Sequence, residues 1–592
     1  MLRNSLSTQM WAFVVAASYF ISLLLYQWSK YPDAFNAYFQ YDSSWLNSLY
    51  YVGVLSGICC LCYFIWQELG ADETRKSDWK IMGVFLLSGV LLYLGSFHGV
   101  LAPNGDNAEY IINAKSLVER GKILRLDVPS ETPNPLASPL LPLMLAPIYM
   151  IWGFSVLPMK ILILLFCLGS GILLYIFFRQ DYTVSRSAIL TMVSFTSPFL
   201  VASSNTIMTE GPYLFFSLLA LIYIRKYWLS NVFSVTVYLL MLLFIILTYL
   251  TRAVGASLLL AAFLFLLTTV SWKKTIRDPG RNWFGKIEIK KILWLFIPVF
   301  AGMVLWQVMQ AQQGVSQMGI LINFDLLHHL SDNLVTLKNT LGQILFSPSS
   351  FRWYKQSADY DLASFNMVWL IILLVLFIGL GFDLYRRRLV AFYTICFVVL
   401  VLMASQTPQE RVFMRYFSVM IPFLIYHLHS FTELITIVLN RNQARPLAAI
   451  IPLLILGHLY IANISSDRYN VRVKSAVFND WYESFLSASK WCGENLPGDS
   501  YVMSVKPRIV YLYSGLHGMA ATNDRDVYSE VYEKNKLDEI KAKKVTHIIV
   551  DAISKVSMES LYPVIQNNPD KFEKLPIPGL DDKCTVVRVR DF

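Results

Sequence analysis

The stretch that decides the fold is residues 157–178, which read LPMKILILLFCLGSGILLYIFF. Lys160 is the only residue within it that carries a formal charge. Because an α-helix rises about 1.5 Å per residue, a helix of this length exceeds the roughly 30 Å hydrocarbon core of a bilayer. The stretch therefore predicts a membrane-spanning helix.

Similar apolar stretches recur along the chain and predict about thirteen crossings. They are expected near residues 10–26, 46–66, 81–101, 157–178, 187–204, 211–228, 232–250, 254–272, 292–311, 366–385, 389–405, 414–438 and 446–464. The first stretch has full length, and neither a basic region nor a small-residue cleavage site flanks it. It therefore predicts a retained helix rather than a signal peptide.

The composition of the 592 residues supports a polytopic membrane protein, since 55% are hydrophobic, only 15% are charged, and the mean hydropathy is +0.48. Soluble chains carry roughly 25% charged residues. This excludes a cytosolic enzyme, a disordered protein and a lone membrane anchor. The net charge of +10 is interpreted as cytoplasmic loop charge rather than a nucleic-acid footprint, and seven cysteines are too few for a disulfide scaffold.

Lysine and arginine collect in alternate loops, which orients the chain because short cytoplasmic loops carry an excess of positive charge. These loops contain Arg3; Arg75, Lys76 and Lys80; Arg179 and Arg186; Arg225 and Lys226; the basic run 273–291; Arg386, Arg387 and Arg388; and Arg441 and Arg445. The N-terminus is therefore predicted to be cytoplasmic, and an odd number of spans places the C-terminal tail outside. Ser138–Gly153, short and interrupted by prolines, is then expected to lie in the interface without crossing.

Three regions are predicted to be extracytoplasmic: a first loop at 102–156, a second loop at 312–365 and a tail at 465–592. The chain thus divides into two additional N-terminal helices (1–70), a membrane domain with both loops (79–464) and the tail.

The tail is predicted to form a small extracytoplasmic α/β domain. Its expected elements are helices at 481–495 and 527–544, a turn at Pro497-Gly498, and strands at 501–505, 545–551 and 584–589. Cys492 and Cys584 are its only cysteines, and the sequence leaves open whether they pair or remain thiols.

The first loop contains the motif Pro103-Asn104-Gly105-Asp106-Asn107-Ala108-Glu109-Tyr110, which predicts the start of an amphipathic helix that ends at Gly121. One interpretation is structural: Asp106 is the N-cap, and Glu109 three residues on completes a variant of the capping box. The alternative is that these carboxylates take part in chemistry at the outer face.

Further charged residues are predicted at that face. Glu210, in Thr209-Glu210-Gly211-Pro212, begins a helix, where the helix dipole favours a carboxylate. Arg252 and Arg415 break the cytoplasmic pattern of basic residues, and each is either a snorkelling side chain or a ligand for an anion. Carboxylates and arginines at one face of an apolar bundle are what an anionic lipid-linked substrate and a hydroxyl acceptor would require.

In their order along the chain these motifs resemble the C superfamily of membrane glycosyltransferases (GT-C). The resemblance rests on Gly105-Asp106-x-x-x-Tyr110, Ala114-Lys115-Ser116-Leu117, Gly121, Leu140-Leu141-Pro142-Leu143, Thr209-Glu210-Gly211-Pro212 and Arg415-Tyr416. Within the superfamily the chain looks similar to bacterial members of the dolichyl-phosphate-mannose protein mannosyltransferase type (glycosyltransferase family 39) and to the lipid A aminoarabinose transferases. The resemblance covers most of the chain from about residue 80 onward.

The resemblance implies a polytopic α-helical enzyme that moves a sugar from a polyprenyl-phosphate-linked donor to a hydroxyl of a lipid, glycan or protein acceptor. It further implies Asp106 as the catalytic base, and the expected location is the extracytoplasmic face of a bacterial inner membrane. Related chains often have Asp-Glu where this one has Asp106-Asn107. Many related chains also have a Lys or Tyr before a double proline, and this residue contacts the donor. Residues 136–140 lack that pattern, so the resemblance does not predict this donor contact here.

Other site residues are expected from their chemistry and placement. Glu210 and Glu109 are further catalytic candidates; Arg415, Arg252 and Arg411 are candidates for binding the donor phosphate; Tyr110 and Tyr416 are candidates for positioning substrate. A polyprenyl phosphate is already a stabilised leaving group, so direct displacement with inversion needs no metal or other cofactor. His328, His329, Asp325 and Asp332 are expected to belong to a solvated helix rather than a metal site.

Two other functions fit the same architecture: a transporter or flippase of lipid-linked sugars, and a polyprenyl-linked glycan ligase. Transporters usually place charges near the membrane midplane. The predicted spans are almost free of internal charge, and the ionisable residues gather at the outer face instead. This distribution favours surface chemistry over passage.

Overall fold

The computed structural model describes only part of the chain. The described residues are 52, 56–60, 63, 79–103, 105–134, 138–229, 234–269, 293–294, 297–304, 308, 326–346, 362–404, 410–438, 480–521, 528–553, 557–580 and 584–590. The expected spans 10–26 and 446–464 lie outside them, as do most residues of 46–66 and 292–311.

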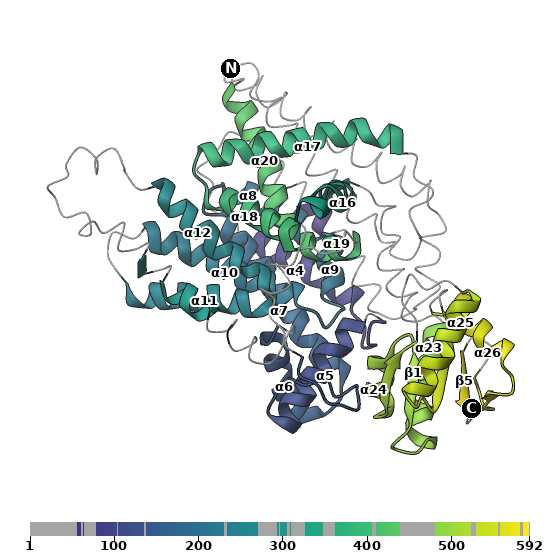
Figure 1. Cartoon of the computed structure of the whole chain (residues 1–592). Coiled ribbons are helices and arrows are strands. Elements are labelled where there is room, and N and C mark those ends of the chain that lie inside the picture. Colours follow the sequence, from purple (N-terminus) through teal and green to yellow (C-terminus); the bar gives the residue numbers. More distant parts are fainter. Residues whose placement is uncertain are drawn as a thin grey trace. The chain divides into compact units, whose positions relative to one another are not determined.

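The contacts divide the chain into two compact units (Figure 1). The first unit comprises residues 1–98, 161–205 and 209–471, and the second comprises residues 99–160, 206–208 and 472–592. The structure thus groups the first loop with the tail, which the sequence did not predict.

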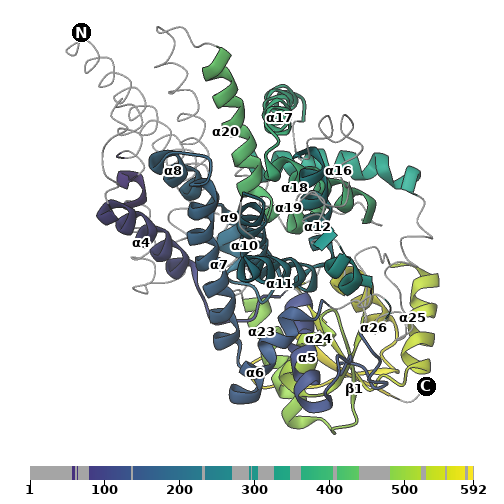
Figure 2. The same ribbon diagram turned by 90° about the vertical axis from the view of Figure 1, so that its left-hand side faces the viewer.

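The described part of the first unit is helical (Figures 1 and 2). Its elements are α4 (Trp79–Ser96), α7 (Val156–Phe178, which begins in the second unit), α8 (Val184–Phe195), α9 (Pro198–Ser203), α10 (Glu210–Leu229), α11 (Val235–Thr251), η1 (Ala253–Gly255), α12 (Ala256–Thr269), α16 (Leu326–Phe346), α17 (Leu362–Tyr385), α18 (Leu389–Ala404), α19 (Glu410–Ser418) and α20 (Ile421–Val438). Helices α10 and α11 pack against each other, as do α17 and α20, and α12 and α18.

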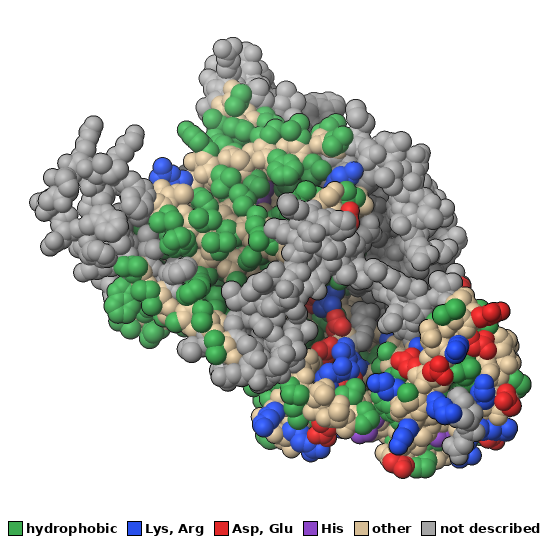
Figure 3. All heavy atoms as spheres, in the orientation of Figure 1, with side chains coloured by type: hydrophobic (Ala, Val, Ile, Leu, Met, Phe, Trp, Pro, Cys, Tyr) green, Lys and Arg blue, Asp and Glu red, His purple; other side chains and the backbone are tan. Residues whose placement is uncertain are grey.

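Helix α7 matches the decisive stretch of sequence. Within the described residues it alone is long and apolar enough to cross a membrane, while other apolar helices contribute stretches of 10–17 residues. Its exposed side chains include Ile161, Leu165, Ile172 and Ile176, which are 42–60% exposed. A row of large apolar side chains facing outward is unfavourable in water and suits contact with lipid tails. On the face seen in Figure 3, hydrophobic side chains likewise gather over the helices of the first unit.

Two predicted spans are wrong as single helices. The stretch 187–204 contains α8 and α9, separated at Thr196-Ser197, and the stretch 414–438 contains the end of α19 and then α20, separated at Val419-Met420. In both cases a proline follows the break: Pro198 begins α9, and Pro422 is the second residue of α20. A continuous helix would lose a hydrogen bond and force the proline ring against the carbonyl four residues earlier.

The second unit combines helices with a five-stranded sheet. Its elements are α5 (Gly105–Arg120), α6 (Leu140–Trp152), α23 (Asp480–Asn495), β1 (Tyr501–Ser504), α24 (Pro507–Ser514), β2 (His517–Ala520), α25 (Glu530–Ala542), β3 (His547–Asp551), η4 (Ser557–Leu561), α26 (Tyr562–Asn567), β4 (Phe572–Lys574) and β5 (Cys584–Val589). The strand order is β2-β1-β3-β5-β4. Strands β1, β2 and β3 run parallel, and β5 pairs antiparallel with both β3 and β4.

The expected helices and strands of the tail coincide with α23, β1, α25, β3 and β5. The sequence missed α24, β2, η4, α26 and β4, each of eight residues or fewer. One face of the sheet is covered by a core that contains Met503, Ile548, Val550 and Val587. Cys492 and Cys584 are both buried, and no disulfide joins them to each other.

Candidate functional site

The first unit brings together three of the predicted site residues, each from a different helix. Glu210 is the first residue of α10, where the helix dipole favours its carboxylate. Arg252 is the C-cap residue of α11, with an extended backbone (φ −154°) that turns the chain out of the helix. Arg415 lies in the last turn of α19. These three residues are called the Glu210 cluster below.

Directly after Arg252 the backbone turns and passes close to the end of α11. A Cβ atom at Gly255 would lie 2.8 Å from the backbone of Thr248, so a larger residue would push η1 away from the end of α11. Glycine at this position lets the chain turn directly after Arg252.

Both arginines contact the same carboxylate oxygen. Arg415 donates from Nε to Oε1 of Glu210 at 3.0 Å, and Nη1 of Arg252 lies 3.3 Å from that oxygen. Nη1 of Arg252 also donates to the Arg415 carbonyl at 3.4 Å, and its guanidinium lies 4.3 Å from the centre of the Tyr416 ring. The exposed fractions of the Glu210, Arg252 and Arg415 side chains are 5%, 9% and 26%. The two arginines are therefore held within the fold and do not simply snorkel.

Among its three members the Glu210 cluster has one carboxylate and two guanidiniums, and both guanidiniums contact that carboxylate. Oε2 of Glu210 is buried and forms no hydrogen bond within the described part of the chain. Arginine presents several donors in a planar fork that matches phosphate oxygens. The cluster can therefore bind an anion. The carboxylate engaged by both arginines is better placed to orient them than to accept a proton.

In the second unit, Asp106 and Tyr110 lie on α5. The sequence-based interpretation of Asp106 as the N-cap is wrong, because the helix already begins at Gly105 and Asp106 is inside its first turn. Its half-buried carboxylate still lies at the positive end of the helix dipole. Tyr110, also half-buried, follows one turn later. The predicted end of the helix is confirmed, since α5 stops at Arg120 and Gly121 adopts φ +68°.

Glu109 is engaged in an ion pair that the sequence did not reveal. Nη1 of Arg508, in α24, lies 2.5 Å from Oε2 of Glu109. Nδ2 of Asn134 donates to the other oxygen of Glu109 at 2.8 Å. No local pattern points to Arg508, which comes near the opposite end of the chain. Both oxygens of Glu109 are thus occupied, which makes it a weaker candidate for a base than Asp106.

Neighbouring basic groups in this unit also carry their charge at neutral pH. The hydrogen bond from Arg125 to Asp127, at 3.0 Å, raises the pKa of Arg125 above its usual value. Burial is the largest single influence on Lys115 and lowers its pKa, but the hydrogen bond to Tyr511 together with the charge interactions with Tyr511, Tyr149 and Glu119 raises it by more, so this pKa is also raised.

The structure describes the remaining predicted site residues only in part. Arg411 lies in α19, but its side chain is outside the described residues. His328 and His329 lie in α16 together with Asp332, which is exposed, while Asp325 is not described. No group of three residues suited to holding a metal occurs in the described ranges.

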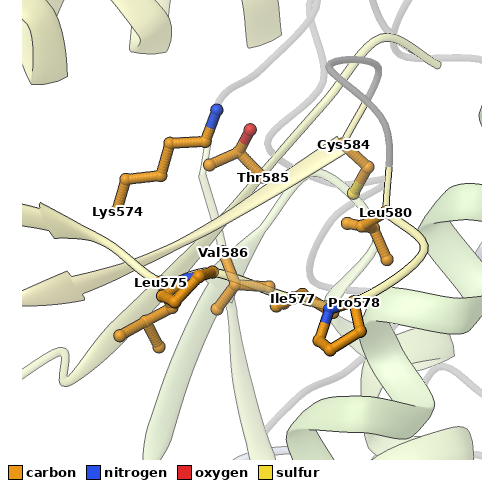
Figure 4. Close-up of a pocket in the computed structure, with 9 residues that line it drawn as sticks. Lys574, Leu575, Ile577, Pro578, Leu580, Cys584, Thr585 and Val586 are labelled. Atoms are coloured by element: carbon orange, nitrogen blue, oxygen red, sulfur yellow. The ribbon is translucent and has the colours of Figure 1, made fainter.

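A small cavity of about 320 Å³ lies beside β4 and β5 (Figure 4). Its lining consists of Lys574, Leu575, Pro576, Ile577, Pro578, Leu580, Cys584, Thr585 and Val586. None of the predicted site residues contributes to it.

Comparison with known proteins found similar solved structures, whereas no protein-family model and no curated protein matches the sequence. ArnT from Cupriavidus metallidurans bound to undecaprenyl phosphate has a TM-score of 0.50 and 10% identity, over 86% of this chain and 98% of that chain. The Archaeoglobus fulgidus oligosaccharyltransferase tethered with an acceptor peptide has a TM-score of 0.51 and 12% identity, over 83% and 72%. The archaeal oligosaccharyltransferase AglB, in complex with an inhibitory peptide and a dolichol-phosphate, has a TM-score of 0.50 and 13% identity, over 80% and 69%.

These likenesses extend over most of each chain and establish a fold. The chain has the helical membrane fold of the GT-C glycosyltransferases, so the predicted resemblance is confirmed at the level of the fold.

Proposed function

We propose that this protein is an integral-membrane glycosyltransferase that moves a sugar from a polyprenyl-phosphate-linked donor to an acceptor hydroxyl. The observation that supports the proposal is the Glu210 cluster, in which two guanidiniums from different helices meet at one largely buried carboxylate. The donor phosphate becomes more negative as the sugar leaves, and a fixed guanidinium stabilises that charge without first having to reorganise. Arg415, the more exposed of the two arginines, contacts the phosphate, and Arg252 supports it.

The reaction is a direct displacement. The acceptor oxygen forms a bond to the anomeric carbon while the bond from that carbon to the phosphate oxygen breaks, and polyprenyl phosphate departs with the electron pair. Asp106 takes the proton of the acceptor hydroxyl. Attack opposite the leaving group inverts the anomeric configuration. Asp106 is proposed rather than Glu109, because Glu109 is held by Arg508 and Asn134.

The membrane arrangement is part of the proposal. About thirteen crossings, a cytoplasmic N-terminus and an extracytoplasmic tail agree with the alternation of basic loops. The proposed transfer takes place at the outer face of a bacterial inner membrane. A tag at Phe592 is expected to react with membrane-impermeant reagents in intact cells, and reaction with permeant reagents alone would reject this topology.

Asp106→Asn tests the chemistry most directly. The amide keeps the size of the side chain and removes its basicity, so turnover is expected to fall roughly 10²- to 10⁴-fold, the usual cost of a lost general base. The assay follows the release of polyprenyl phosphate and radiolabelled sugar transfer in membranes supplied with polyprenyl-phosphate hexoses and pentoses. Glu109→Gln and Glu210→Gln are measured beside it and are expected to lose less.

Full transfer activity in purified, folded Asp106→Asn would end the assignment of the base. Movement of lipid-linked sugar across the membrane without bond cleavage would instead support the transporter alternative.

A further inference from the structure

We propose that the C-terminal segment 472–592 positions the helix that carries the base, and that Arg508 is a positioning residue acting through Glu109. The inference rests on the proposed function, because it takes Asp106 as the base. Every contact used below lies within the second unit.

The backbone that leads into α5 is held from two sides. The Val100 carbonyl accepts a hydrogen bond from Nζ of Lys160 at 2.5 Å, and the Leu101 carbonyl accepts one from the Tyr482 hydroxyl at 2.8 Å. Lys160 and Tyr482 are both completely buried. Buried donors of this kind are costly to leave unpaired, so they fix the chain a few residues before Asp106.

The first turn of α5 is held by Arg508. Residues three apart occupy neighbouring positions on a helix surface, so a contact that fixes Glu109 also restricts the position of Asp106. Arg508 reaches Glu109 at 2.5 Å and approaches Asp127, farther along the same loop, at 3.9 Å. The Gly518 amide also donates to the Asp127 carbonyl at 2.8 Å. The tail therefore contacts both α5 and the segment that follows it in the sequence.

Apolar packing continues the same contact along the helix. Ile112 of α5, Leu126 of the loop and Tyr511 of α24 form one buried cluster. The ammonium group of Lys115, one turn farther along, lies 4.7 Å from the centre of the Tyr511 ring. Helix α5 thus packs on α24 along its length, although nearly 390 residues of chain separate them.

This arrangement matters because a base must be held within a narrow range of positions. A displacement of about 1 Å can cost about 10²-fold in rate. Segments that connect helices are usually mobile, so a base carried by such a segment needs support from a rigid element. The sheet and α24 supply that support here.

Arg508→Gln is the decisive variant. It removes the ion pairs of Arg508 with Glu109 and Asp127, and each carboxylate keeps another partner, since Asn134 still bonds to Glu109 and Arg125 still pairs with Asp127. The variant is therefore expected to fold. Its kcat should fall about 10- to 100-fold, with the KM for donor unchanged, because the phosphate ligands are untouched. Arg508→Lys should recover part of the loss.

A double-mutant cycle with Glu109→Gln separates positioning from a general loss of packing. If Arg508 acts through Glu109, the double variant should be no slower than the slower single variant. Arg590→Gln is the matched control, since Arg590 pairs at 3.8 Å with Glu573 on the same sheet and both side chains are well exposed. Additive losses in the double variant, or an equal loss in Arg590→Gln, would overturn the inference.

Hydrogen exchange keeps this test independent of the identity of the base. The amides of residues 108–116 are expected to exchange faster in Arg508→Gln than in the unmodified protein. If that happens while Asp106→Asn keeps full activity, the proposed base is wrong and the anchoring role of Arg508 stands. If exchange on α5 is unchanged, the positioning role is wrong whatever the base.

Discussion

The first unit contains two groups of arginines and carboxylates that differ in composition and in hydrogen bonding. The Glu210 cluster has one carboxylate for two arginines. A second group, called the Arg388 cluster, contains Asp383, Arg386, Arg388, His427 and Glu433. It has two carboxylates for two arginines, and both arginines belong to one loop that is predicted to be cytoplasmic. The two groups therefore differ in the ratio of carboxylates to arginines among their members.

The Arg388 cluster is densely bonded. Arg388 reaches Asp383 at 2.8 Å and Glu433 at 2.9 Å, and Arg386 also pairs with Glu433. The second oxygen of Asp383 lies 2.6 Å from Nδ1 of His427, and Nε2 of that ring lies 2.9 Å from the Thr394 hydroxyl. By contrast, Oε2 of Glu210 forms no hydrogen bond within the described residues. The comparison supports a structural role for the Arg388 cluster and is consistent with the binding role proposed above for the Glu210 cluster.

The largest effect is expected for Arg388→Gln. Breaking a buried ion pair by removing one partner costs about 3–5 kcal/mol, because it leaves a buried charge uncompensated, and Asp383 is completely buried. Thermal unfolding of the purified protein in detergent should show a strongly destabilised variant. Arg415→Gln, at a side chain 26% exposed, should lose much less. Equal stability losses at both sites would break the comparison.

A smaller and more selective effect is expected for Arg415→Lys. A hydrogen bond to a charged group is worth about 1.5–3 kcal/mol, so losing the guanidinium fork should reduce kcat/KM for donor about 10- to 100-fold. Folding should be preserved. Arg386→Lys makes the same exchange in the Arg388 cluster and should leave donor use unchanged. Donor kinetics that follow Arg386 instead would reverse the assignment of the two clusters.

The smallest effect is expected at Tyr416, whose ring faces Arg252. A cation–π contact is worth about 0.5–2 kcal/mol, so Tyr416→Leu should reduce kcat/KM for donor about 2- to 30-fold. Tyr416→Phe keeps the aromatic face and should behave like the unmodified protein. A large loss in Tyr416→Phe would point instead to a role for the hydroxyl group.

The sequence predicted several elements closely because their signals are local. Residues 157–178 match α7, and the expected strands at 545–551 and 584–589 match β3 and β5. Gly121 ends α5 as predicted. The predictions of single helices over 187–204 and 414–438 were wrong. Hydropathy is averaged over a window and does not detect a single proline, whereas Pro198 and Pro422 interrupt the backbone hydrogen bonds of a continuous helix.

By itself, the sequence determined the membrane class of the protein and selected Asp106, Glu210, Arg252 and Arg415 as candidate residues. Those inferences depend on apolar run length, loop charge and motif order, all of which can be read along the chain. Only the tertiary structure decided that Glu210 pairs with both Arg252 and Arg415 and that Glu109 pairs with Arg508. Such partners are brought together by packing between helices far apart in sequence, and no local pattern of residues encodes which charges will meet.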